Sequence, residues 1–209
     1  MKHLRIILWA LAGTAFLVFI ALALPRDNQN TMSETMSFQP VAGFNQGSDF
    51  QLTSHTGKVF DSRNDIHDDE YALIFFGFTH CPVICPTELQ KFSETMDMLS
   101  DEAALKIKPL FITIDPERDT VDVMREYVPL FHPAIIGLTG DVATVHGILD
   151  EWKVFYSKVN DPQMNDYTMD HSTYSYLVDS DMKILSVFRM QATAEEIAAR
   201  INDLVAVNK

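Results

Sequence analysis

The hydrophobic and polar positions divide this chain into one long apolar run, a polar stretch and a longer segment with alternating patterns. Residues 6–24 carry no charge, whereas residues 26–48 are largely polar and show no apolar period. From Asp49 onward, short apolar runs alternate with segments in which apolar residues recur every three or four positions. Short runs are typical of strands, and the longer spacing is typical of amphipathic helices. The pattern predicts an N-terminal segment at 1–25, a tether at 26–48 and one α/β domain at 49–209.

The domain is predicted to hold a hairpin, two strand–helix units, a further helix, a second hairpin and a final helix. Two nearly continuous apolar runs, 71–78 and 107–114, are typical of strands buried on both faces of a sheet. Alternating strands and helices predict a central sheet with helices on both faces. A strand followed by paired cysteines at a helix start is the thioredoxin arrangement, here with an N-terminal β-hairpin extension. The remaining predicted elements are hairpins at 50–60 and 173–188, helices at 88–99, 121–130, 142–152 and 193–205, a strand at 152–157, and a polar loop at 160–170.

The N-terminal apolar run has the length of a membrane-spanning helix. Lys2 and Arg5 precede it, and the chain behind it is acidic. A transmembrane helix needs roughly 20 apolar residues, whereas the apolar part of a signal peptide usually has about 7–15. The charge asymmetry predicts one transmembrane helix with the N-terminus inside and the domain outside. A signal peptide cleaved near residues 21–23 is the alternative.

The charge balance narrows the classes of partner. The chain has a formal net charge of −13, and two of its 16 basic residues lie before the apolar run. A strongly acidic domain does not suit the phosphate backbone of a nucleic acid or an anionic membrane surface. We therefore expect no nucleic-acid partner.

Cys81 and Cys85 are the only cysteines, and they directly follow the apolar strand at 71–78. A disulfide that closes so short a loop adds little stability, so redox or metal chemistry is favoured over a structural bridge. Pro82 and Pro86 place the pair in a loop that runs into the first turn of a helix. There the helix N-terminus favours the thiolate over the thiol.

Two thiolates alone leave a soft metal ion short of a ligand, and the chain offers seven histidines as candidates for a third. His80 is the immediate neighbour of Cys81 and is expected to point away from it. His171 stands where the polar loop enters the second hairpin, a junction that faces the cysteine helix in a thioredoxin fold. An ordinary loop histidine is the alternative. Further along, Asp115 or Asp119 is expected to cap the following helix, and a role of Asp115 beside the site or in partner docking is the alternative.

Three segments carry a resemblance to a known family. Residues 78–89, FTHCPVICPTEL, resemble the signature of the Sco/SenC family. Residues 114–120, IDPERDT, and 170–172, DHS, match its two other marked segments, and FQLT at 50–53 with Gly57-Lys58 matches its domain start. The resemblance implies a membrane-anchored, thioredoxin-like copper protein that assists assembly of the CuA centre of cytochrome c oxidase. It implies copper ligation by Cys81, Cys85 and His171.

The expected function is therefore that of a metallochaperone that delivers copper to the CuA-bearing subunit of the oxidase. Two thiolates and an imidazole suit Cu(I) and can also hold Cu(II). Other copper chaperones or thiol reductants are further candidate partners. The expected location is the bacterial inner membrane, with the domain in the periplasm. Val83 departs from the family, which commonly has an aspartate there, so affinity and redox potential carry over less directly than the ligands.

Two other functions are compatible with a cysteine pair. A thiol–disulfide oxidoreductase that keeps the CuA-site cysteines reduced needs only Cys81 and Cys85 as its redox pair, one to attack and one to resolve the mixed disulfide. His171 separates the two functions, because a dithiol reductant does not need it. A peroxidase of the peroxiredoxin kind is disfavoured, because Phe78 stands where a threonine is expected, three residues before the first cysteine.

Overall fold

We describe a computed structural model for residues 45–160 and 166–207. Its centre is a seven-stranded sheet with the strand order β2-β1-β5-β4-β3-β8-β9. Three central strands are parallel: β3 (Tyr71–Gly77), β4 (Ile107–Thr113) and β5 (Ile136–Thr139). On the β3 side, β8 (Ser175–Asp179) and β9 (Ile184–Phe188) continue the sheet in antiparallel pairing. The predicted mixed α/β architecture with a second hairpin near the C-terminus is confirmed.

The N-terminal hairpin extends the other edge of the sheet. β1 (Gln51–Ser54) pairs with β2 (Val59–Asp61) and also with β5, both antiparallel. Gly57 lies in the connecting turn at a φ of 82°, a backbone conformation that glycine adopts without steric cost. The hairpin predicted from the alternating pattern at 50–60 is therefore present, as an addition to the sheet.

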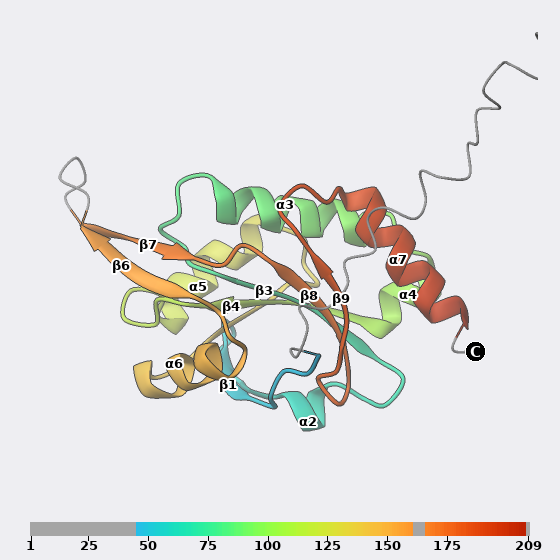
Figure 1. Cartoon of the computed structure of the whole chain (residues 1–209), viewed down its shortest axis with the longest axis horizontal. Coiled ribbons are helices and arrows are strands. Elements are labelled where there is room, and N and C mark those ends of the chain that lie inside the picture. Colours follow the sequence, from blue (N-terminus) through green and yellow to red (C-terminus); the bar gives the residue numbers. More distant parts are fainter. Residues whose placement is uncertain (1–44, 161–165, 208–209) are drawn as a thin grey trace, which may run out of the picture. The chain divides into compact units, whose positions relative to one another are not determined.

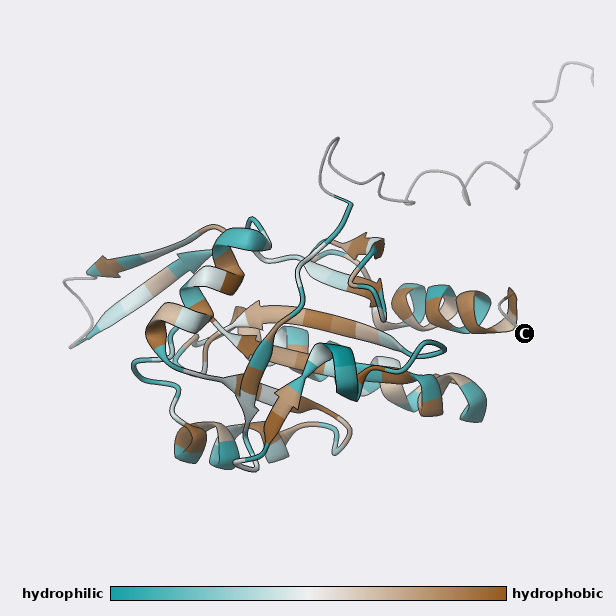
Figure 2. Cartoon of the chain, turned by 90° about the horizontal axis from the view of Figure 1, so that it is seen from below, coloured by the Kyte–Doolittle hydropathy of each residue, from teal (hydrophilic) through white to brown (hydrophobic). Residues whose placement is uncertain are grey.

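Helices cover both faces of the sheet, as neighbouring residues of β3 show. Phe75 packs against Phe92 of α3 (Ile84–Asp97), with ring centroids 6.4 Å apart. The side chain of Phe76 points to the opposite face, where its ring lies 5.5 Å from that of Trp152, the C-cap of α6 (Val142–Glu151). Figure 1 shows α3 and α7 (Ala194–Val207) on one side of the sheet and α6 on the other. Figure 2 shows the central strands coloured mostly as hydrophobic.

Four short helical segments complete the domain. They are α2 (Ser62–Asp65), α4 (Asp101–Lys106), α5 (Val121–Tyr127) and the 3-10 turn η1 (Val128–Leu130). The predicted helix at 121–130 is thus α5 followed by η1, and α4 has too few residues to show an apolar period.

Two strands stand apart from the main sheet. β6 (Tyr156–Asn160) and β7 (Tyr167–His171) pair antiparallel with each other as a separate two-stranded sheet, which we call the β6–β7 ribbon. Figure 1 shows the ribbon projecting from the domain. The predicted polar loop at 160–170 is therefore wrong over β7, and the predicted strand at 152–157 begins only at Tyr156. The reason is that most ribbon side chains are exposed or half-buried, so the ribbon lacks the apolar alternation of a core strand.

Side chains cap α5, α6 and α7, and the cap of α5 differs from the expected one. Asp141 caps α6 by accepting a hydrogen bond from the backbone N–H of Thr144. Thr193 and Glu196 form a reciprocal capping box at α7. The cap of α5 is Thr120, so the expectation that Asp115 or Asp119 caps this helix is wrong. Both aspartates are buried and accept hydrogen bonds from other parts of the chain.

Residues 45–48, which precede β1, contact the core, although their polar pattern predicts that they belong to the tether. Gly47 donates a backbone hydrogen bond to Met182, and the indole of Trp152 donates to the carbonyl of Ser48. The predicted membrane anchor and the rest of the tether lie outside the described residues. Within residues 45–160 and 166–207, no helix is long and apolar enough to cross a bilayer.

Candidate metal centre

The two cysteines stand on either side of the start of α3. Cys81 is half-buried in the turn that follows β3, and Cys85 is buried in the first helical turn. Pro86 is tolerated there because the N–H groups of a helix's first turn have no intrahelical partner. Both cysteines are free, and the backbone N–H of Cys85 donates to the sulfur of Cys81 at 3.4 Å. The placement predicted from the strand and the prolines is confirmed.

Cys85 has room because the last residue of β3 is glycine. A Cβ at Gly77 would lie 2.9 Å from the Sγ of Cys85 and within 3.0 Å of the rings of Phe75 and Phe111. Carbon atoms do not approach sulfur or aromatic carbon this closely without displacing them. The glycine therefore lets the sulfur pack directly against the end of the central strand.

Hydrogen bonding makes the two sulfurs chemically different. The pKa of Cys81 is lowered to about 5, first by the hydrogen bond from the Cys85 thiol and then by the backbone N–H groups of residues 83–85. The pKa of Cys85 is raised, because its thiol donates to Cys81 and because it is buried. At neutral pH, Cys81 is therefore a partly accessible thiolate and Cys85 a buried thiol.

His171 comes to the pair from the end of the β6–β7 ribbon. Its Nε2 lies 3.8 Å from the Sγ of Cys85. The imidazole packs against the rings of Phe75 and Phe78, with centroid distances of 6.2 and 5.8 Å. His171, the candidate ligand from the sequence, therefore lies beside Cys85.

The tautomer of His171 follows from its other nitrogen. Nδ1 lies 2.8 Å from the carbonyl oxygen of Ser172, so Nδ1–H is the donor and Nε2 is left with its lone pair facing Cys85. Burial lowers the pKa of His171, which favours the neutral ring that a metal ion requires. A ligating histidine usually donates its second N–H to a carbonyl or carboxylate in this way.

Asp119 supports the cysteine loop, a role that sequence reasoning missed. Its carboxylate accepts from the backbone N–H and the hydroxyl of Thr79, at 3.0 and 2.5 Å, and from the hydroxyl of Thr113 at 2.6 Å. Burial raises its pKa despite these hydrogen bonds. Thr79 lies two residues before Cys81, so Asp119 ties the cysteine loop to the end of β4. The position of Asp119 in the DPERD segment was the available signal.

Tyr127 is a second neighbour that the sequence did not reveal. Its hydroxyl is buried and has no hydrogen-bond partner among the described residues. Burial raises its pKa, and the neighbouring acidic groups of Cys85, Cys81 and Asp119 raise it further. Nothing in the helical pattern of residues 121–130 distinguishes this tyrosine from its neighbours.

The other histidines of residues 45–160 and 166–207 do not join the cysteines. His80 is exposed, as expected for the immediate neighbour of Cys81, and its Nδ1 lies 3.1 Å from the hydroxyl of Thr79. His146 stacks on Tyr156 at 4.7 Å, and His55 and His132 hold backbone groups near β5.

The side chains in the described part of the chain do not form a complete metal-binding site in this conformation. In residues 45–160 and 166–207, no three cysteine, histidine, aspartate or glutamate side chains converge closely enough to hold an ion. Cys85 adjoins both Cys81 and His171, so the donor set of two sulfurs and one imidazole nitrogen needs only local movement to close. That set fits a soft ion such as copper.

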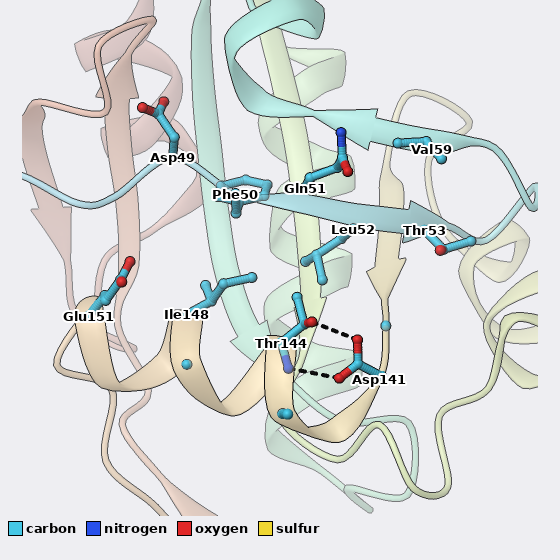
Figure 3. Close-up of a pocket in the computed structure, with 13 residues that line it drawn as sticks. Asp49, Phe50, Gln51, Leu52, Thr53, Val59, Asp141, Thr144, Ile148 and Glu151 are labelled. Atoms are coloured by element: carbon cyan, nitrogen blue, oxygen red, sulfur yellow. Dashed lines mark hydrogen bonds between the residues drawn. The ribbon is translucent and has the colours of Figure 1, made fainter.

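Two hollows open on the surface of the domain. One, of about 480 Å³, borders His171 and is lined by Phe155, Tyr174, Arg189 and Met190, among others. The other, of about 550 Å³, lies between β1 and α6 (Figure 3) and contains none of the predicted site residues. The dashed lines in Figure 3 are the bonds between Asp141 and Thr144 that cap α6.

The fold and the cysteine pair define the class of protein. It is a thioredoxin-like protein whose two thiols stand at the start of α3, the helix that follows the central strand β3. The SCO1/SenC family model matches residues 39–206. The chain therefore belongs to the SCO1/SenC family. The SCO2-like protein of Rickettsia felis is 44% identical over 152 residues, which are 72% of this chain and 73% of that protein.

Solved structures agree with this assignment. Bradyrhizobium japonicum ScoI, solved with copper bound, is 39% identical, with a TM-score of 0.68 over 76% of this chain and 98% of that chain. BsSco, described as a member of the Sco family of cytochrome c oxidase assembly proteins with a disulfide switch, shares the fold at 20% identity, with a TM-score of 0.56 over 78% of this chain and 95% of that chain.

Proposed function

We propose that this protein binds copper through the thiolates of Cys81 and Cys85 and the Nε2 of His171, and passes the ion to the CuA site of cytochrome c oxidase. The observation that carries the proposal is the 3.8 Å separation between Cys85 Sγ and His171 Nε2, with Nδ1 held by Ser172. A simple dithiol does not need an imidazole held in this orientation. The copper in the B. japonicum relative supports the choice of ion.

The asymmetry of the cysteines suits a site that must also release its cargo. Cys81 is half-exposed and already a thiolate, so it is the donor that an incoming ion meets first. Cys85 must lose its proton before it binds, and His171 completes the site from the ribbon. Cu(I) tolerates two thiolates alone, whereas Cu(II) prefers nitrogen as well as sulfur. We therefore propose Cu(I) as the main cargo and Cu(II) as a state that depends on His171.

The proposed location follows from the N-terminal apolar run. A helix at 6–24 would anchor the chain in the bacterial inner membrane and hold the domain in the periplasm, where the CuA-bearing subunit of the oxidase is the proposed acceptor. Other copper chaperones or thiol reductants are the proposed suppliers of copper or electrons.

A copper titration of the reduced full chain tests this function. We expect one copper per chain, strong loss of Cu(II) affinity in His171→Ala, and almost no copper on the oxidised protein, because a disulfide offers no thiolate. His67→Ala is the matched control, since His67 is exposed and lies before β3, whereas the cysteines follow the other end of that strand. Equal copper loading before and after oxidation would refute the three-ligand site.

The second candidate function is thiol–disulfide exchange that keeps the CuA-site cysteines reduced. The observation that favours it is the accessible Cys81 thiolate beside a buried Cys85 thiol, an arrangement that provides an attacking and a resolving sulfur. In this reaction Cys81 attacks the target disulfide, one target sulfur leaves as a thiolate, and Cys85 then displaces the other and forms the Cys81–Cys85 disulfide. Electrons pass from the dithiol to the target.

Oxidase assembly in cells separates the two functions. If copper delivery is the task, His171→Ala should fail to support assembly although its dithiol still forms and breaks a disulfide. Assembly that persists without copper binding would identify the protein as a reductant.

A further inference from the structure

His171 is carried by a piece of structure that is not part of the main sheet. In the described residues β7 pairs only with β6, so side chains must set its position against the core. Alternate residues of a strand share a face, which places Tyr167, Met169 and His171 on one side of β7. Met169 is buried, and His171 adjoins Cys85. Tyr167 lies on the same face at the other end of β7, and it is fixed to the core.

Tyr167 makes three interactions with Asp115 and Arg118, two residues that follow β4. Its hydroxyl donates to Oδ1 of Asp115 at 2.8 Å, and its carbonyl accepts from Nη1 of Arg118 at 2.7 Å. The guanidinium also lies over the tyrosine ring, 3.7 Å from its centroid. Arg118 in turn donates through Nε to Oδ2 of Asp115 at 2.5 Å. We call these three residues the Tyr167 latch.

Hydrogen bonds connect Asp115 of the latch to Asp119, the residue that holds the cysteine loop. The backbone N–H of Asp115 donates to the hydroxyl of Thr113, and that hydroxyl donates to Asp119. Asp119 holds Thr79, just before Cys81. Residues 113–119 therefore position both halves of the site: the cysteine loop through Asp119, and the ribbon through the latch.

We propose that Tyr167 is a positioning residue that, through Asp115 and Arg118, sets the approach of His171 to Cys85 and thereby the affinity of the site for Cu(II). Tyr167 does not touch the ion; it acts through the strand that it shares with His171. This inference rests on the function proposed above, in which His171 is a copper ligand. Cu(I), held by the two thiolates, is expected to depend little on the latch.

The first test replaces the tyrosine hydroxyl alone. Tyr167→Phe removes the bond to Asp115 but keeps the ring under Arg118. We expect about a tenfold loss of Cu(II) affinity, the lower end of what changes around metal ligands cost, with little change for Cu(I). Tyr156→Phe is the matched control, because it removes another ribbon hydroxyl for which the described part of the chain provides no hydrogen bond. An equal effect of the two variants would overturn the proposal.

A double-mutant cycle shows whether the latch acts through His171. In a His171→Ala background, Tyr167→Phe should cause no further loss of Cu(II) affinity, since the group that it positions is gone. A loss of the same size in both backgrounds would mean that Tyr167 affects the thiolates or the whole fold, and would overturn the positioning role. Nitrogen hyperfine coupling in the Cu(II) spectrum should weaken in Tyr167→Phe alone.

A measurement without metal keeps this inference separate from the copper proposal. The His171 ring packs against two phenylalanine rings, so its proton resonances in the reduced, metal-free full chain should show ring-current shifts. Tyr167→Phe should move them toward the values of a free histidine, and Tyr156→Phe should not. If His171→Ala leaves Cu(II) affinity unchanged, the copper site is wrong, and these shifts still decide the positioning role. Unchanged shifts in Tyr167→Phe would overturn it.

Discussion

The carboxylate of Asp119 accepts a hydrogen bond from the backbone N–H of Thr79, forty positions earlier in the chain. Asn at position 119 keeps one acceptor oxygen and replaces the other by a donor NH2 group, which would face groups that now donate to Oδ1 or Oδ2. We expect Asp119→Asn to lower the free energy of unfolding by about 1–3 kcal/mol, measured by urea denaturation. Asp203→Asn, at an exposed position of α7, should change it by less than about 0.5 kcal/mol. Equal effects would show that Asp119 has no supporting role.

Gly77→Ala tests the close packing of Cys85 on β3. The new methyl group would lie 2.9 Å from the sulfur and would displace it or the neighbouring rings. We expect a loss of about 1–3 kcal/mol of stability together with weaker copper binding. Gly147→Ala in α6 is the control: nothing lies within 4 Å of its Cβ position, and alanine favours a helix by about 0.5–1 kcal/mol. A neutral Gly77→Ala would contradict the packing described here.

The thiolate character of Cys81 predicts a specific pH dependence of alkylation. Its pKa is lowered to about 5, so the reactive thiolate is present above that pH and is lost as the pH falls through it. The rate of iodoacetamide modification should therefore stay nearly constant between about pH 8 and pH 6. Cys85→Ala removes the thiol donor, and its rate should already fall over this range. A tenfold fall per pH unit in the unsubstituted protein would show an ordinary thiol.

Copper binding should release about one proton per Cu(I) at about pH 7. Cys81 has already lost its proton, and burial keeps His171 neutral, so only the Cys85 thiol has one to lose. Calorimetry in two buffers with different ionisation enthalpies measures this number. Two ordinary thiols would release about two protons, and that result would contradict the asymmetry of the pair.

Residue pattern alone located the central strand and the cysteine turn, because each leaves a local signal. A continuous apolar run marks β3, and two prolines mark the loop that becomes α3. For His171 the pattern left two interpretations open, a ligand and an ordinary loop histidine. Resemblance to the family then added the ligand set. These features depend on neighbours in the sequence, which a single chain displays.

The supporting residues were harder to predict because their partners are distant in the sequence. Asp119 and Asp115 were expected to cap a helix, since an aspartate before a helix usually does so. Instead, Asp119 accepts from Thr79, and Asp115 accepts from Tyr167, 52 positions away. β7 escaped prediction for a different reason: most of its side chains are exposed or half-buried, so it lacks the apolar alternation that reveals a core strand.

Cys85 and His171 are separated by 86 positions. An ion held by both would act as a cross-link that closes a loop of this length in the unfolded chain. In the chain-entropy estimate such closure is worth about 4–5 kcal/mol, against about 2 kcal/mol for a disulfide between Cys81 and Cys85. Loading the site would therefore restrain the whole span from the cysteine helix to the ribbon, whereas oxidation would restrain one turn. An ion bound in this way would itself be a structural element of the protein.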